Sequence, residues 1–174
     1  NGHKNPRFLA EAIAVLRREG LPFCGLFIGA GEQADDLASR EGCRLHGYMP
    51  ADQLAELYVA SDIAAWPVSY SASQVEAAAC GLPVIMTIEE LELREVCIPY
   101  RELDLDSMVA VLRRLASEQE RQRVGLAGAR IVHDRLSWNV IARTRARDYA
   151  AAVERRDYES LAPGASSGGG KAPA

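Results

Sequence analysis

The chain has 174 residues, enough for one domain with a hydrophobic core, and its 48% apolar and 25% charged residues are ordinary for a globular protein. A net charge of -4 argues against a nucleic-acid-binding protein, whose contact surface would be basic. No apolar run approaches the roughly 20 residues of a membrane-spanning helix. The four cysteines form no C-x-x-C pair, so we expect buried free thiols in a reducing cytoplasm: Cys24, Cys43, Cys80 and Cys97.

The first third of the chain alternates between helical and strand patterns. Apolar residues recur at helical spacing from Pro6 to Glu19, with Asn5 as the expected N-cap and Gly20 as the end. The elements expected next are a strand over 22–28, a helix over 32–41, a strand over 44–46, a helix over 52–60 and a strand over 63–66. This alternation predicts an open parallel α/β sheet.

The stretch from Trp66 to Thr87 predicts one strand–helix–strand unit. A loop of small polar residues, 69–73, leads into an alanine-rich helix that contains Glu76, and a Gly-Leu-Pro turn leads into a strand over 84–86. We expect Glu76 in the first turn of that helix, at the carboxyl ends of the strands, where open α/β sheets bind ligands. The alternative is an acid that only complements the helix dipole.

The remaining sequence predicts a strand and three helices. The acidic segment 88–95 is expected to be a solvated stretch, and residues 96–100 form an apolar strand candidate. Helices are expected over 104–115, over 118–133 and from Ser137 onward, where we expect Trp138 to pack. The last residues, from about 161, are rich in Pro, Gly, Ser and Ala, and we expect them to be disordered.

Four short motifs carry a resemblance to a known family. They are the string E-A-x-A-C-G-x-P-V-I from Glu76 to Ile85, K-N-P from Lys4, G-Y-M-P from Gly47 and S-W-x-x-I-A from Ser137. Together they resemble the donor-nucleotide region of retaining GT-B glycosyltransferases of the glycosyltransferase 4 type, over roughly residues 4–153. The resemblance implies the C-terminal, donor-binding half of such an enzyme, a Rossmann-like sheet with helices on both faces.

The resemblance also implies roles for individual residues. Glu76 would hydrogen-bond the ribose hydroxyls, and Lys4 would contact the donor pyrophosphate. The other expected contacts are the nucleotide for Gly29 and Gly31, the nucleobase for Gly47 and Tyr48, and phosphate or sugar hydroxyls for Ser71 and Ser73. The sequence departs from the family at Val68, where an acid that holds the donor sugar is usual. No catalytic residue is assigned.

The activity implied is transfer of a hexose-type sugar from a nucleotide-sugar to an acceptor, with retention of configuration and without metal or cofactor. It belongs to polysaccharide or glycoconjugate biosynthesis, and we expect it in the cytoplasm. The expected partners are the nucleotide-sugar and an N-terminal GT-B domain, through which any peripheral membrane association would occur. Two alternatives remain open: a degenerate, non-catalytic GT-B domain, and an isomerase similar to nucleotide-sugar 2-epimerases.

We further expect this chain to be one piece of a larger fold. Residues 1–159 would form a nucleotide-sugar-binding domain that lacks its first strand, followed by a disordered tail over 160–174. Since the lost strand would leave an open position in the sheet, marginal stability or self-association is expected. Alone, the chain would bind nucleotide weakly and transfer no sugar.

Overall fold

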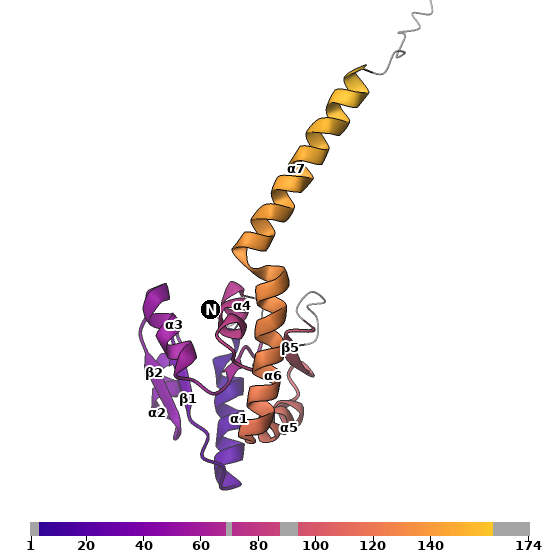
Figure 1. Cartoon of the computed structure of the whole chain (residues 1–174). Coiled ribbons are helices and arrows are strands. Elements are labelled where there is room, and N and C mark those ends of the chain that lie inside the picture. Colours follow the sequence, from indigo (N-terminus) through magenta and orange to yellow (C-terminus); the bar gives the residue numbers. More distant parts are fainter. Residues whose placement is uncertain (1–3, 69–70, 88–93, 162–174) are drawn as a thin grey trace, which may run out of the picture. The chain divides into compact units, whose positions relative to one another are not determined.

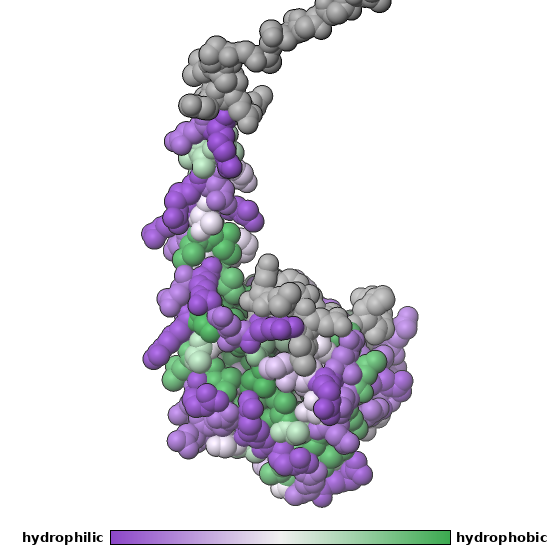
Figure 2. Space-filling view, turned by 90° about the vertical axis from the view of Figure 1, so that its right-hand side faces the viewer, coloured by the Kyte–Doolittle hydropathy of each residue, from purple (hydrophilic) through white to green (hydrophobic). Residues whose placement is uncertain are grey.

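The computed structural model describes residues 4–68, 71–87 and 94–161. The chain divides into two compact units, Asn1–Leu136 and Ser137–Ala174, which are treated separately. In its described part the second unit is one helix, α7 (Trp138–Leu161), along which hydrophilic side chains predominate (Figure 2). Trp138, which the sequence analysis expects to pack, is 85% exposed at the start of this unit.

The first unit alternates strands and helices (Figure 1). The strands are β1 (Gly25–Ile28), β2 (Cys43–His46), β3 (Ala64–Ala65), β4 (Val84–Thr87) and β5 (Cys97–Tyr100). The helices are α1 (Pro6–Arg18), α2 (Ala34–Ser39), α3 (Ala51–Val59), α4 (Ala72–Ala79), α5 (Leu105–Arg114), α6 (Glu118–Ile131) and a π-helical turn (Val132–Leu136). The predicted elements are therefore present in order, while residues 88–93 of the acidic segment 88–95 and residues 162–174 of the predicted tail lie outside the described residues.

The described strands form two parallel sheets, β1–β2 and β3–β4–β5. In the first, Gly25 is opposite Cys43, and in the second, Val84 is opposite both Ala64 and Cys97. The predicted strands are thus parallel and open, and no described strand joins β1 to β3.

Helices α1 and α5 show that all five strands run in the same direction. At their C-terminal ends, Nη2 of Arg113 lies 2.7 Å from Oε1 of Glu19. At the other end, the ring of Phe8 stacks on Tyr100, just before α5, with centroids 6.1 Å apart. The two helices are therefore parallel. Since α1 folds back into β1 and β5 folds back into α5 through short links, β1 and β5 are also parallel.

The core occupies both faces of β4, as expected for a sheet covered on two sides. Ile85 belongs to a cluster with α1 and α5 that includes Leu16 and Met108, both fully buried. Val84 and Met86 face the opposite way, into a cluster with Ala77 and Ala78 of α4. Helix α1 also contacts the first sheet, through a third cluster: Ala10, Ile13, Phe27 and Leu37.

Two sequence expectations need correction. Helix α4 begins at Ala72, so Glu76 lies beyond its first turn. The reason is a capping box: the N–H of Ser71 donates to Oε1 of Gln74 at 3.2 Å, which starts the helix inside the predicted loop. The cysteines are free, but only Cys97 is buried; Cys24 and Cys80 are exposed because they lie outside the strands and on the rim of α4.

We predict that Tyr100→Phe lowers the free energy of unfolding by about 1–2 kcal/mol at neutral pH, because the buried hydroxyl donates to the carbonyl oxygen of Pro67. Burial raises the pKa of Tyr100 from 10.0 to about 12. Between pH 10 and 12 the folded state therefore keeps a proton that the unfolded state loses. The contribution of Tyr100 to the free energy of unfolding is complete below pH 10 and falls as the pH rises from 10 to 12. Urea unfolding across that range should show that the free energy of unfolding declines less steeply with pH in the variant than in the parent protein. An identical slope in both proteins would contradict the assignment.

Candidate functional site

The residues that the sequence singles out lie at one edge of the first unit. Strand β1 ends before Gly29, β2 before Gly47, and β3 leads toward α4 and its Ser71. Because the strands are parallel, their carboxyl ends share this edge. Lys4, exposed just before α1, lies at the same edge, since Phe8 in the first turn of α1 contacts Tyr100 at the end of β5.

The start of α4 brings two predicted residues together. Oγ of Ser71 lies 2.7 Å from Oγ of Ser73, and both side chains are half-buried. The capping box with Gln74 holds this first turn in place. The N-terminus of α4 thus presents hydroxyls beside the positive end of a helix dipole, a combination that suits anionic or hydroxyl-rich ligands.

Glu76 is exposed on α4, and among the described residues its carboxylate has no hydrogen bond or ion pair. Its neighbour is Tyr58 of α3, which the sequence analysis does not single out. Burial raises the pKa of Tyr58, the charge of Glu76 raises it further, and a hydrogen bond with Ser73 opposes the rise. Tyr58 was missed because its place beside α4 depends on tertiary packing.

The first sheet contributes two loops to the same edge. Gly29 has φ +130°, a conformation that favours glycine, and its N–H donates to the carbonyl oxygen of His46 at 2.9 Å. This bond ties the turn that contains Gly31 to the loop that contains Gly47. Tyr48, in that second loop, is 88% exposed. Its ring therefore packs against little of the described chain and remains available to cover a planar ligand.

The structure groups these residues in two sets. Ser71, Ser73 and Glu76 belong to the second sheet, and the glycine turns and Tyr48 belong to the first. No hydrogen bond or ion pair links the two sets among the described residues, and none holds Lys4. Gln33, next to the first glycine turn, was also missed: its buried Oε1 has no hydrogen-bond partner, and no sequence pattern distinguishes it.

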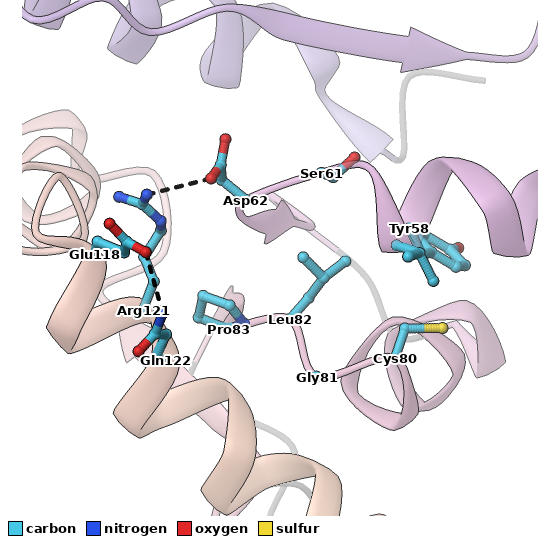
Figure 3. Close-up of a pocket in the computed structure, with 11 residues that line it drawn as sticks. Tyr58, Ser61, Asp62, Cys80, Gly81, Leu82, Pro83, Glu118, Arg121 and Gln122 are labelled. Carbon is cyan, nitrogen blue, oxygen red and sulfur yellow. Dashed lines mark hydrogen bonds and ion pairs between the residues drawn. The ribbon is translucent and has the colours of Figure 1, made fainter.

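A hollow of about 260 Å³ lies at the opposite edge, where the residues before β3 and β4 meet α6 (Figure 3). The side chain of Arg121 lines this hollow, but its guanidinium already has partners. Its guanidinium donates to the carbonyl oxygens of Leu115 and Ala116, each at 3.0 Å, and lies 3.2 Å from Oδ1 of Asp62. These contacts already neutralise and hydrogen-bond the guanidinium of Arg121, so it is not free to bind a ligand. We therefore attribute the hollow to the way α6 packs against the sheet and do not include it in the candidate site.

Within residues 4–68, 71–87 and 94–161, no cluster of three or more His, Cys, Asp or Glu side chains could hold a metal ion. In the same part of the chain, no helix combines the length and the apolar character that crossing a membrane requires.

Comparison with known proteins adds to this geometry. Residues 1–118 match the family model described as glycosyl transferases group 1. Among solved structures, sucrose-phosphate synthase from Thermosynechococcus elongatus is similar over 89% of this chain and 44% of its own, with TM-score 0.74 and 20% identity. TarM is similar over 84% of this chain and 32% of its own, with TM-score 0.69 and 13% identity. A search of curated proteins finds no match.

At these identities the two structures establish a shared fold. The chain spans less than half the length of either one. The predicted α/β class, with open parallel sheets and alternating helices, is confirmed, and it corresponds to half of a GT-B fold.

Proposed function

The chain belongs to the glycosyl transferases group 1 family, and we propose that it carries the part of such an enzyme that binds a nucleotide-sugar donor. The observation that carries the proposal is the position of Glu76. Its carboxylate is exposed and unpaired among the described residues, near the hydroxyl pair Ser71 and Ser73, on the helix that follows the carboxyl end of β3. A carboxylate there can accept hydrogen bonds from both ribose hydroxyls.

The other residues supply complementary chemistry. The ammonium of Lys4 and the N-terminus of α4 would stabilise the negative charge of the leaving diphosphate, which is the role that basic groups take in metal-independent sugar transfer. Tyr48 would cover the base, and the turns at Gly29 and Gly47 would border the nucleotide. The reaction proposed is transfer of a hexose-type sugar with retention, completed by an acceptor-binding half, so that this chain alone transfers no sugar.

We predict that one of UDP, GDP and ADP binds in calorimetric titration and that Glu76→Ala weakens binding by about 1–3 kcal/mol, the range for a charged hydrogen bond. The matched control is Glu56→Ala, which removes another exposed, unpaired glutamate, on α3. Binding that survives Glu76→Ala unchanged would refute the role of Glu76. Sugar transfer by this chain alone would refute the need for a second half.

Val68 favours a second candidate, a domain that keeps the fold without donor chemistry. This half-buried apolar side chain stands where the family usually has the acid that holds the sugar. Under this alternative, the folded chain would bind none of the three nucleotides, or would bind one equally well with Glu76→Ala. The same titration therefore separates the two candidates.

A further inference from the structure

We propose that Tyr100 is a positioning residue of the donor site, which holds the first turns of α1 and α4 at the same edge of the first unit. Its ring contacts the turn that follows Lys4, and its hydroxyl holds the segment that leads to Ser71. This inference rests on the proposed function, because it concerns the residues proposed to bind the donor diphosphate. Tyr100 is 1% exposed and acts only through its neighbours.

The hydroxyl of Tyr100 fixes the exit from β3. The N–H of Trp66 donates to the carbonyl oxygen of Ile85 at 2.9 Å, but Pro67 has no N–H with which to continue the pairing with β4. The carbonyl oxygen of Pro67 instead accepts the hydrogen bond from Tyr100, and both residues are buried. A side chain of β5 therefore holds the chain where its pairing with β4 ends.

The carbonyl held by Tyr100 lies close in sequence to the hydroxyl pair Ser71 and Ser73. Only residues 68–70 separate Pro67 from Ser71, the N-cap of α4. At that cap, the N–H of Ser71 donates to Oε1 of Gln74, which is fully buried. The first turn of α4 thus has two fixed points, Gln74 and, through a short link, Pro67. Loss of the second would let the two hydroxyls shift relative to a bound phosphate.

The ring of Tyr100 holds the start of α1. It stacks on the ring of Phe8, with centroids 6.1 Å apart, and Phe8 is itself buried. The N–H of Phe8 donates to the carbonyl oxygen of Asn5 at 3.1 Å, in the turn that directly follows Lys4. Displacing Phe8 would therefore shift the segment that carries Lys4, while the bond to Pro67 could persist.

The backbone of Tyr100 is fixed on both sides, so the residue can serve as a support. Tyr100 is opposite Thr87 in the register of β4 and β5. After it, the N–H of Arg101 donates to Oγ of Ser107 at 3.0 Å, and Asp104 accepts hydrogen bonds from both residues, at 2.7 and 2.8 Å. These bonds tie the residue after Tyr100 to the first turn of α5.

The hydroxyl distinguishes Tyr100 from its neighbours in the core. The other buried members of its cluster are apolar, and a phenylalanine would fill nearly the same volume. Burying a phenol without a hydrogen-bond partner is unfavourable, so the bond to Pro67 is what makes tyrosine acceptable here. The additional oxygen thus serves to hold one backbone carbonyl and, through it, the start of α4.

The test measures the Kd of UDP, GDP and ADP by NMR titration and combines variants in double-mutant cycles. We expect Tyr100→Phe to weaken the diphosphate that the parent binds best by about tenfold, the value of one hydrogen bond. In a Ser73→Ala background its effect should fall to about twofold or less, because the group that it positions is gone. In a Lys4→Ala background it should keep its full effect, since the ring contact with Phe8 remains.

Phe8→Leu should give the opposite pattern. It removes the ring contact and leaves the hydroxyl bonded to Pro67, so its effect on affinity should depend on Lys4 and not on Ser73. A purely structural role would lower affinity equally in both backgrounds. The proposal is overturned if Tyr100→Phe is additive with Ser73→Ala, or if Phe8→Leu is additive with Lys4→Ala.

Ile98→Val is the matched control, because it removes one buried methyl group from the same strand and the same cluster. Affinity for the diphosphate should stay within about twofold of the parent, as expected for a substitution outside the two contacts of Tyr100. A loss as large as that in Tyr100→Phe would show that general loosening of the core is responsible and would overturn the proposal.

Amide exchange without ligand separates this inference from the proposed function. Tyr100→Phe should speed exchange at the hydrogen-bonded amides of Ser71 and Gln74 by about tenfold relative to Ile98→Val. Unchanged exchange would overturn the proposal even where a diphosphate binds. If the parent binds none of the three diphosphates, the proposed function fails, whereas faster exchange would still support the hold of Tyr100 on α4.

Discussion

Replacing Gly125 by alanine is expected to lower the free energy of unfolding by about 2–4 kcal/mol, although alanine favours a helix interior by about 1 kcal/mol. A Cβ at Gly125 would collide with the carbonyl oxygen of Gly81 and lie 2.9 Å from its carbonyl carbon. These are backbone atoms in the turn between α4 and β4, where Gly81 has φ +85°. The turn cannot retreat as a flexible side chain could, so α6 would have to move off α4.

Two variants of α6 serve as controls for urea unfolding. In Gly128→Ala the Cβ would lie 3.0 Å from the carbonyl oxygen of Val96, which is tight but closer to an ordinary contact, so a smaller loss is expected. Ala127→Gly, at an exposed position, should cost about 1 kcal/mol through helix propensity alone. A Gly125→Ala protein as stable as the parent would show that α6 does not approach Gly81 this closely.

The second large effect is expected at α1. Ile13→Ala and Leu16→Ala each remove a buried side chain, 3% and 0% exposed, and each should cost about 2–5 kcal/mol. Their effects on amide exchange should differ. Since Ile13 packs on Phe27, its loss should speed exchange in β1 and β2 far more than in β4, whereas loss of Leu16 should speed exchange at Ile85 as well.

Val59→Ala is the control, because this side chain is 74% exposed and its truncation should change stability by no more than about 0.5 kcal/mol. If both α1 variants speed amide exchange equally in β1 and in β4, the two sheets open together. That result would contradict the assignment of Ile13 and Leu16 to separate apolar clusters.

The order and type of the elements could be predicted because apolar spacing reports burial directly. The first and last residues of single elements could not be predicted, since they depend on particular hydrogen bonds. The strand expected from Pro22 begins only at Gly25, because the N–H of Phe23 donates to Leu21 in a tight turn, at 2.8 Å. In the same way, the bond between Ser71 and Gln74 moves the start of α4 and with it the position of Glu76.

The candidate site was predictable to a similar degree. Glycines and serines after strands could be assigned to the carboxyl edge from chain order alone, and the structure places them there. The influence of the Glu76 charge on the pKa of Tyr58 could not be predicted, because it depends on how α3 lies against α4. The division of the site between two sheets, β1–β2 and β3–β4–β5, could not be derived from the alternation of strands and helices alone.

The ion pair between Glu19 and Arg113 joins residues 94 positions apart. Helix α1 therefore finishes synthesis long before the residues of β5 and α5 that bury Leu16 and Phe8 have left the ribosome. At roughly 5–20 residues per second, this delay amounts to roughly 5–20 s. During that interval the part of α1 that contains Phe8 and Leu16 is exposed to solvent, to chaperones and to other nascent chains. The yield of folded protein should thus depend on how the cell protects this one helix during translation.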